Sequence, residues 1–413
     1  MPESQVGGVW PAVGPRTWPA APDEMTVSTL GEIEACPRRW ALASAEYPEL
    51  WSRRGYPPRL HTPSLAGSVI HLVLETVTKA LTRAGCASVR DSGAVQVMKE
   101  LGGYTKLVND CIDRVVHRFG DNPRAARVLE TALRSLRSQV PAMRAQAQSL
   151  LGRLRLHGGP AGPGTRPTER TRTPVRHGVH PELELRAPKI GWRGKADIVV
   201  VSPDICEIID FKTGAQDDAH GFQLRVYALL WARDGELNPS AARVGKLTLS
   251  YRTGDVEVDP PSSAELDALE RDLVARREAA MKAVSAQPPE ARPSAETCRY
   301  CAVRQLCEVY WQPTTERRPS GTNEETPFMD LEISLVGRHG PSSWDAVEVV
   351  SRGPDAGKRV LLRVASTAAD LRTGDRVRVL DAHVSTDPDD ESQPAVVTMT
   401  SLSEIFLVRR VRS

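Results

Sequence analysis

The sequence predicts a mixed α/β domain followed by a small all-β barrel. Apolar residues recur at helical spacing as far as about residue 156, and three strand-like segments follow between residues 181 and 212. From residue 329 onward the chain is a series of short strand patterns separated by turns. Strands with helices before and after them are typical of a mixed β-sheet flanked by helices, and evenly spaced short strands are typical of a small barrel.

The predicted helices lie in the first 156 residues. Residues 1–24 are rich in Pro, Gly and Ala, so we expect a disordered N-terminal segment there. Thr26 or Ser28 can cap a helix that continues to about residue 45. Further helices are expected at residues 67–83, 94–118 and 124–156. Residues 157–178 consist largely of Gly, Pro, Thr and Arg, a composition that predicts a mobile basic loop.

The predicted sheet and barrel follow this loop. Strands are expected at residues 181–186, 191–201 and 205–212, a helix at 221–233, a hairpin at 246–252 and 255–258, and a long helix at 263–285. Barrel strands are expected at residues 331–336, 346–351, 359–365, 375–383, 395–400 and 405–408. The chain therefore divides into an α/β domain of residues 25–312, a linker of residues 313–327 and an OB-like β-barrel of residues 328–413.

Composition excludes a membrane protein and a disulfide-rich secreted protein. Apolar residues make up 40% and charged residues 26% of the 413 residues, as in ordinary globular proteins. The longest apolar runs are too short to cross a bilayer, and the N-terminus does not resemble a secretion signal. We therefore expect a cytoplasmic protein without a membrane partner. In that reducing environment the seven cysteines are metal ligands or buried thiols.

Basic residues are concentrated in one stretch of the chain. The net charge is only +2, but residues 114–193 contain fifteen Arg and one Lys against five Asp or Glu. A segregated basic stretch suits a groove that binds the phosphates of a nucleic acid. An arginine-rich surface that merely stays solvated explains the same excess.

The densest chemical signal lies on two of the predicted strands. One strand carries Gly194 and Asp197 as G-x-x-D, and the next carries Asp210 and Lys212 as D-x-K. Asp210 and Lys212 are two residues apart, so they point to the same face of a strand. Carboxylates bind divalent cations that activate water for phosphodiester hydrolysis, and a neighbouring lysine stabilises the developing charge. Taken alone, so short a motif more often marks a solvent-facing Asp and Lys.

Three further residues change this balance by their order along the chain. His71 lies in a predicted helix upstream, and Gln223 and Tyr227 lie one turn apart on the helix after the D-x-K strand. The order of a helix histidine, G-x-x-D, D-x-K and Q-x-x-x-Y resembles the RecB-type branch of the PD-(D/E)XK nucleases. That branch includes nuclease modules of bacterial recombination helicases and CRISPR-associated adaptation nucleases.

This resemblance implies a role for each motif residue. Asp197, Asp210 and Lys212 would be catalytic, and Mg²⁺ or Mn²⁺ would be bound by His71, Asp197, Asp210 and the carbonyl of Phe211. Gln223 and Tyr227 would support the site and contact DNA. On the preceding strand, Glu182 or Glu184 is either an auxiliary acid or a surface residue. The resemblance implies an α/β PD-(D/E)XK core and a metal-dependent deoxyribonuclease acting on single-stranded or end-exposed DNA, in DNA repair, recombination or phage defence.

Four cysteines stand apart from the other three. Cys36 lies near the N-terminus, whereas Cys298, Cys301 and Cys307 form a C-x2-C-x5-C trio after the predicted sheet. Four thiolates complete either a zinc site or an iron–sulfur cluster, and buried free thiols are a third reading. This arrangement resembles the RecB-like subfamily with a [4Fe–4S] cluster, in which the two chain ends are stapled together. Cys86, Cys111 and Cys206 have no such spacing and are expected to be buried.

The ligand of the C-terminal barrel is not determined by its pattern. OB-like barrels often bind single-stranded nucleic acid, and docking to a protein is an equal alternative. Candidate residues for a nucleic-acid face are Arg338, Trp344, Arg359, Arg363, Arg376 and Arg378. The chain has no G-x-x-x-x-G-K-[ST] loop, so ATP-driven unwinding would require a helicase or other subunit in trans. The rival to a nuclease is a non-catalytic iron–sulfur subunit that binds DNA or acts as a scaffold in a larger complex.

Overall fold

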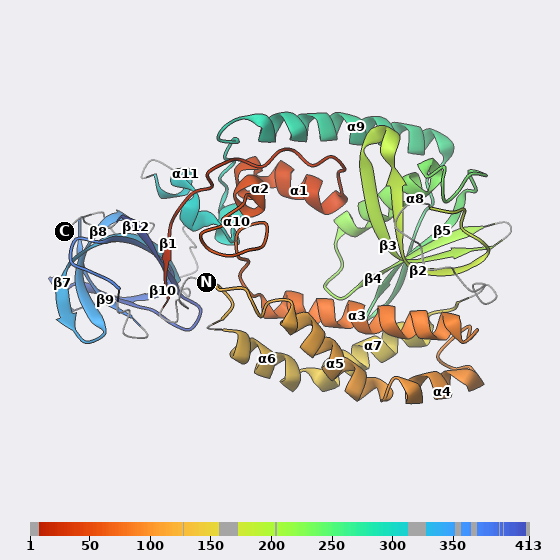
Figure 1. Ribbon diagram of the computed structural model, residues 1–413, viewed down its shortest axis with the longest axis horizontal. Coiled ribbons are helices and arrows are strands. Elements are labelled where there is room, and N and C mark those ends of the chain that lie inside the picture. Colours follow the sequence, from red (N-terminus) through yellow and green to blue (C-terminus); the bar gives the residue numbers. More distant parts are fainter. Residues whose placement is uncertain are drawn as a thin grey trace.

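The computed structural model contains a mixed α/β domain and a β-barrel, joined through a segment that carries three of the cysteines (Figure 1). It describes residues 8–126, 128–156, 172–202, 205–312, 328–351, 357–364, 370–387, 389–390 and 392–409. The expected linker at 313–327 and residues 157–171 of the expected mobile loop lie outside the described residues.

The α/β domain is built on a five-stranded sheet of order β2-β3-β4-β5-β6. Its strands are β2 (Gly178–Ala187), β3 (Trp192–Val201), β4 (Cys206–Lys212), β5 (Val244–Tyr251) and β6 (Gly254–Val258). All neighbours are antiparallel except β4 and β5, which are parallel and are connected by helix α8 (Asp218–Arg233). A parallel connection needs such a crossover, and it places α8 directly after the D-x-K strand.

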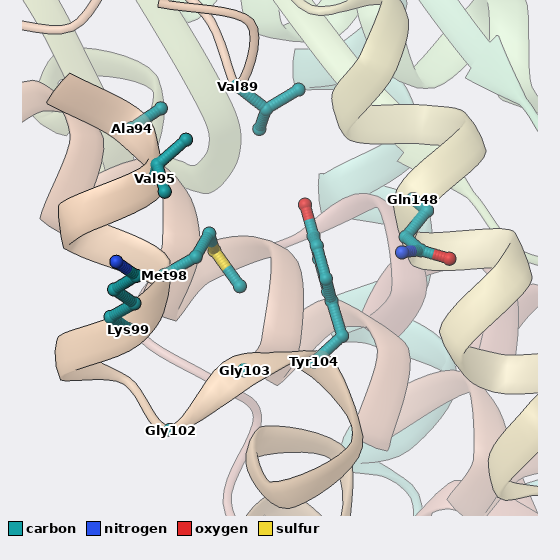
Figure 2. Close-up of a pocket in the computed structure, with 9 residues that line it drawn as sticks. All are labelled: Val89, Ala94, Val95, Met98, Lys99, Gly102, Gly103, Tyr104 and Gln148. Atoms are coloured by element: carbon teal, nitrogen blue, oxygen red, sulfur yellow. The ribbon is translucent and has the colours of Figure 1, made fainter. Parts of the chain in front are cut away.

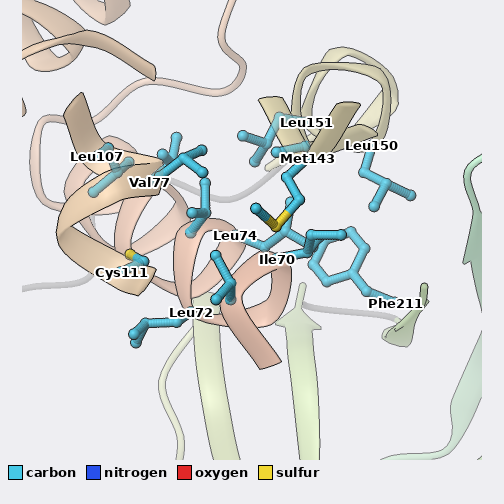
Figure 3. Close-up of a cluster of buried hydrophobic side chains, with 14 of the residues drawn as sticks. Ile70, Leu72, Leu74, Val77, Leu107, Cys111, Met143, Leu150, Leu151 and Phe211 are labelled. Atoms are coloured by element: carbon cyan, nitrogen blue, oxygen red, sulfur yellow. The ribbon is translucent and has the colours of Figure 1, made fainter. Parts of the chain in front are cut away.

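Both faces of the sheet are covered because successive strand residues point to opposite sides. On one face, Ile198 and Phe211 pack against α3 (Thr62–Arg83), α5 (Gly103–His117) and α7 (Val140–Arg153) (Figure 3). On the other face, Val199 and Ile208 pack against α1 (Val27–Ala35), α8 and α9 (Ser263–Ser285). The strands are therefore apolar on both sides, as the sequence indicates.

The helical layer contains more breaks than the sequence predicts. The expected helix at 94–118 is divided into α4 (Ser92–Glu100) and α5 by Gly102 and Gly103, whose φ angles are 78° and 79°. Such φ angles suit glycine and end a helix. The expected helix at 124–156 likewise begins later, as α6 (Leu129–Ser138), and turns at Gln139 into α7.

Helix α3 is long and apolar enough to cross a membrane by length and composition alone. Half of its most apolar window is buried within the fold, and its apolar face forms the centre of the helical core with α5 and α7. These contacts identify α3 as a core helix.

The C-terminal region is a barrel with two extra strands. Five strands close into a ring: β7 (Phe328–Gly340), β8 (Ser343–Ser351), β9 (Arg359–Arg363), β11 (Ala395–Thr398) and β10 (Arg376–Ser385), with β10 pairing back to β7. Strand β12 (Glu404–Arg409) pairs with β10, and β1 (Val9–Pro11) pairs in parallel with β12. The expectation of disorder throughout residues 1–24 is therefore wrong at β1, where Trp10 is buried against the barrel.

Several residues that were expected to form a ligand-binding face of the barrel are instead buried or ion-paired within it. Trp344 lies in the barrel core, and Arg378 is buried in ion pairs with Glu332 and Glu308. Arg376 also pairs with Glu332. A nucleic-acid face built on Trp344 and Arg378 is therefore excluded, because neither side chain reaches the surface; Arg338, Arg359 and Arg363 remain exposed.

Candidate active site

The two motif aspartates lie side by side where β3 and β4 separate. The backbone pairing of these antiparallel strands ends at Ile198, which follows Asp197, and at Ile209, which precedes Asp210. Oδ2 of Asp197 accepts a hydrogen bond from the backbone N–H of Phe211 at 2.7 Å. The side chain of Asp197 thus replaces the next ladder bond, which fixes its carboxylate against β4.

His71 reaches the same point from helix α3. Its Nδ1 lies 3.6 Å from Oδ1 of Asp197. One turn earlier, a Cβ atom at Gly67 would lie 3.0 Å from Oγ1 of Thr213, so glycine allows α3 to approach the loop after β4. Burial lowers the pKa of His71, but the hydrogen bond and charge of Asp197, with the charges of Asp210 and Glu182, outweigh it and raise the pKa.

Asp210 carries a buried negative charge that its neighbours satisfy only in part. Burial and repulsion from Asp197 raise its pKa to about 6, although Lys212 and His71 oppose this. Nζ of Lys212 forms an ion pair with Oδ2 of Asp210 at 2.6 Å, and this buried oxygen accepts no further hydrogen bond. A bound cation would satisfy it.

Lys212 is held by a chain of hydrogen bonds from α8. Its Nζ donates to Oε1 of Gln223 at 2.6 Å, and Nε2 of Gln223 donates to the hydroxyl of Tyr227 at 2.7 Å. The spacing of four residues on one helix brings Gln223 and Tyr227 together. Burial and the charge of Asp210 raise the pKa of Tyr227, so its hydroxyl remains protonated.

Gly194 explains why the G-x-x-D and Q-x-x-x-Y motifs occur together. A Cβ atom at this position would lie 2.7 Å from Cε1 of Tyr227 and 2.9 Å from Cδ1 of Leu230. The ring of Tyr227 therefore packs directly on the backbone of β3. The sequence shows both motifs but not this contact, because it joins residues on different elements.

The structure separates the two glutamates of β2. Glu182, opposite Asp197, has a φ of 59°, its side chain is largely buried, and it forms an ion pair with Lys195. Glu184 is half exposed and pairs with Arg186. Glu182 is therefore the one whose charge acts on His71. The sequence does not single out Lys195, the partner of Glu182, because it occupies a variable position of the G-x-x-D motif.

Sequence analysis also missed a histidine–tyrosine pair beside Lys212. Nδ1 of His220 and the hydroxyl of Tyr251 are 2.8 Å apart. Tyr251 is the register partner of Lys212 on β5, and His220 precedes Gln223 by one turn. In the sequence, His220 stands three residues before Gln223 of the Q-x-x-x-Y motif, and this spacing is the signal that could have indicated it.

The donor set fits a hard divalent cation. Carboxylate oxygens with one imidazole are suitable ligands for Mg²⁺ or Mn²⁺, and Oδ2 of Asp210 is buried with an ion pair to Lys212 but no hydrogen bond. Among the described residues, however, no three His, Cys, Asp or Glu side chains lie close enough together to hold a metal ion as they stand. Binding would therefore draw His71, Asp197 and Asp210 closer together.

The four cysteines expected to bind a metal centre line one cavity, although they come from both ends of the α/β domain. Cys36 lies between α1 and α2 (Pro37–Ser44), and Cys298, Cys301 and Cys307 lie around α10 (Ala295–Arg299) and α11 (Glu308–Trp311). Sγ of Cys36 accepts hydrogen bonds from the backbone N–H groups of Arg39 and Arg292, each at 3.4 Å. Burial raises the pKa of Cys301 to about 11 in the absence of metal. Cys86, Cys111 and Cys206 are buried elsewhere, as expected.

An open cavity of about 720 Å³ lies apart from both sites, between α4, the start of α5 and α7 (Figure 2). Its lining is Val89, Ala94, Val95, Met98, Lys99, Gly102, Gly103, Tyr104 and Gln148. The lining contains no carboxylate, histidine or cysteine, so this cavity lacks the groups needed for metal-dependent chemistry.

Much of the basic stretch is neutralised by ion pairs. Arg124 pairs with Glu404, Arg137 with Asp113, and Arg153 with Asp255. The excess of arginine between residues 114 and 193 therefore serves the fold in part and does not by itself outline a phosphate-binding groove.

The sequence model of the PD-(D/E)XK nuclease superfamily matches residues 24–308, and this range includes the motif residues from His71 to Tyr227. No curated protein matches the chain. Similar solved structures include the crystal structure of SSO0001, with 19% identity and a TM-score of 0.22; the match covers 32% of this chain and 62% of that one.

Two further solved structures match with a TM-score of 0.17. A murine DNA-binding protein bound to double-stranded DNA is 9% identical, with 58% of this chain and 95% of that one covered. The HINb domain of p204 is 10% identical, with 57% and 94% covered. These scores are too low to support an argument about fold or function.

Proposed function

Because the chain belongs to the PD-(D/E)XK nuclease superfamily, whose members are typically metal-dependent nucleases, we propose that it hydrolyses phosphodiester bonds of DNA. The substrate would be single-stranded or end-exposed DNA, and the metal Mg²⁺ or Mn²⁺. The observation that carries the proposal is the convergence of Asp197, Asp210 and Lys212 at one point, where the buried Oδ2 of Asp210 pairs with the ammonium group of Lys212.

The side chains around this oxygen have distinct tasks in the proposed reaction. Asp197, Asp210, His71 and the carbonyl of Phe211 would hold the cation, which supplies charge neutralisation at the phosphate and an acidified water. Lys212 would donate to the attacking water or to a phosphate oxygen. Gln223 and Tyr227 hold its ammonium group at a fixed point, so little reorganisation is needed when substrate binds.

A nuclease assay with matched variants tests this proposal. The wild type is expected to degrade DNA with Mg²⁺ or Mn²⁺ and to be inactive in EDTA, and Asp210→Ala and Lys212→Ala are expected to be inactive. Gly221→Ala is a suitable control, because Gly221 lies on α8 with open space around the position of a new Cβ. Comparison of single strands, linear duplexes and closed circles defines the substrate. If Asp210→Ala cleaves as fast as the wild type, the proposal is wrong, and DNA binding without cleavage would favour the non-catalytic alternative.

For the cysteine cavity we propose a [4Fe–4S] cluster. The four thiols line one cavity, and a single distant cysteine with a C-x2-C-x5-C trio differs from the paired C-x2-C motifs of zinc ribbons. Four thiolates are enough to hold a four-iron cluster, each through a different iron. Iron and sulfide analysis of the purified brown protein tests this assignment; stoichiometric zinc in a colourless protein would refute it.

We also propose that the nuclease acts beside a helicase or another subunit, in DNA repair or phage defence. The resemblance of the motif order to nuclease modules of bacterial recombination helicases supports a motor that works with this site. Co-purification of a helicase with the tagged chain from its native host tests this partner.

A further inference from the structure

The cysteine loop, residues 298–311, lies between the α/β domain and the barrel (Figure 1). It carries Cys298, Cys301 and Cys307, and its buried residues share a core cluster with Trp10, Leu380 and Phe406 of the barrel region. The barrel therefore covers one side of the segment that supplies three of the four thiols.

Arg304, between Cys301 and Cys307, is the main charged contact of this loop with the barrel. Its side chain is 4% exposed. Nε lies 2.6 Å from Oδ2 of Asp330 on β7, and Nη2 lies 2.8 Å from Oδ1 of Asp381 on β10. The third nitrogen, Nη1, donates to the carbonyl of Cys301 at 3.2 Å. One guanidinium thus joins a cysteine's backbone to two carboxylates of the barrel.

Asp381 is held in an unfavourable backbone conformation to make this contact. Its φ is 53°, at an irregularity in the pairing of β10 with β7. Its N–H donates to Oδ1 of Asp330 at 2.9 Å, and its other carboxylate oxygen pairs with Arg59 at 2.7 Å. A left-handed aspartate inside a strand persists only where its surroundings fix it. The barrel is therefore shaped to present two carboxylates to Arg304.

Two more arginines bind backbone carbonyl groups of the same loop. Nη1 of Arg124, from the helical layer, donates to the carbonyl of Ala302 at 2.7 Å, and its guanidinium pairs with Glu404 of β12. Nη1 of Arg378, from β10, donates to the carbonyl of Gln305 at 2.6 Å. Buried carbonyl groups need such donors, and the barrel supplies one of them, Arg378, and the carboxylate of Glu404 that pairs with the other.

We propose that the barrel is the scaffold of the cysteine loop: recognition of Arg304 by Asp330 and Asp381 fixes three of the four thiols, and any metal centre at the cysteine cavity is retained only while this contact holds. The ligand of this barrel surface is then a segment of its own chain. The proposal deepens the proposed function, because it rests on a metal centre at the cysteines, but not on DNA cleavage.

Asparagine at position 330 removes the charge of the carboxylate and keeps its size. In the full-length protein, Asp330→Asn is expected to release metal to a chelator about tenfold faster than the wild type, because the buried guanidinium of Arg304 loses one of its two carboxylate partners. In the metal-free protein, Cys301 and Cys307 are expected to react with iodoacetamide about tenfold faster, as read by mass spectrometry of the labelled peptides.

Asp375→Asn is the matched control. Asp375 is also a fully buried barrel aspartate, but its Oδ2 accepts a hydrogen bond from the backbone N–H of Arg372, away from the cysteine loop. It is expected to leave metal release and thiol labelling within twofold of the wild type. Circular dichroism establishes that each variant is folded. Should Asp330→Asn fail to fold, Arg304→Lys and Asp381→Asn carry the same test, because each removes one arm of the contact.

Wild-type rates of both metal release and labelling in a folded Asp330→Asn protein would overturn the proposal. Equal acceleration in Asp375→Asn would also overturn it, because general loosening of the barrel would then be the cause. The thiol readout requires neither bound metal nor a nuclease. A chain that cleaves no DNA but shows the expected labelling would contradict the proposed function and leave the scaffold role standing.

Discussion

Replacing Gly194 by alanine tests whether the ring of Tyr227 sets the position of Lys212. The new Cβ would lie 2.7 Å from Cε1 and 3.0 Å from Cδ1 of that ring. Non-bonded carbon atoms normally lie about 3.5–4.0 Å apart, so the ring must retreat by about 1 Å. A shift of that size away from Gln223 would lengthen the 2.7 Å contact between the Tyr227 hydroxyl and Nε2 beyond hydrogen-bonding distance.

Two effects of different size follow from this displacement. Overpacking of this kind costs about 1–3 kcal/mol of folding free energy. Gln223 then loses the hydroxyl that anchors its amide, so the amide that holds Lys212 is free to shift, and an error of about 1 Å at a catalytic group lowers the rate on the order of 100-fold. Gly194→Ala is therefore expected to be a folded protein with a large loss of kcat and little change in DNA affinity.

The assay combines single-turnover cleavage of labelled DNA with DNA binding in Ca²⁺ and a denaturant titration. Tyr227→Phe, which removes only the hydroxyl, is expected to lose less activity than Gly194→Ala. Gly221→Ala, with no atom within 4 Å of the new Cβ, controls for the change from glycine to alanine. If folded Gly194→Ala cleaves within twofold of the wild-type rate, the ring does not position Lys212 and the reasoning fails.

Three further predictions concern charge. Saturation with Mg²⁺ at about 100 times its Kd is expected to stabilise the wild type by about 2.7 kcal/mol, seen as a higher Tm, and Asp210→Asn is expected to lose this response. The pKa of Asp210 is raised from 3.8 to about 6, so protons compete with the cation for this carboxylate. The half-saturating Mg²⁺ concentration should therefore rise about tenfold per pH unit as the pH falls below about 6. A half-saturating concentration that does not change with pH would contradict the role of Asp210 as a metal ligand. The same shift means that metal-free protein loses stability as pH rises from 3.8 to about 6, which Asp210→Asn should abolish. Arg124→Met removes one of the two arginines paired with the buried Glu404, Arg59 being the other, and is expected to cost about 3 kcal/mol at pH 7 by denaturant titration, with a smaller cost once acid protonates Glu404.

The sequence predicted the parts of the site that depend on periodicity and order. Asp210 and Lys212 share a face because strand residues alternate, and Gln223 and Tyr227 share one because helix residues recur about every four positions. Both regularities are local, so spacing alone is enough to predict them. Asp197 joins Asp210 through the antiparallel pairing of β3 with β4, which the order of the motifs indicated. His71 joins them from a distant helix, and only its place in the motif order indicated its role.

Contacts between distant elements escaped prediction. The packing of Tyr227 on Gly194 and the pairing of His220 with Tyr251 each join residues whose separation in sequence has no fixed meaning. The barrel arginines show the opposite error. Arg378 was expected at a nucleic-acid face because arginine is usually exposed, but Glu332 and the carbonyl of Gln305 provide it with partners inside the fold.

The N-terminal segment gives the clearest contrast between composition and structure. Its Pro- and Gly-rich sequence predicts disorder, yet Trp10 is 7% exposed in β1, which adds to the free edge of β12. The segment then reaches Met25, whose backbone pairs with that of Trp192 and Arg193 at the start of β3, two residues before Gly194.

A chain that lacks residues 1–24 would lose the buried indole of Trp10, whose burial is worth about 3–5 kcal/mol by comparison with Trp→Ala changes. We expect a lower Tm for deletion of residues 1–12 and for Trp10→Ala, measured by calorimetry, whereas disorder predicts an unchanged Tm for both. Arg16→Ala is the control, because its contact with Glu49 is a largely exposed ion pair of little energetic weight.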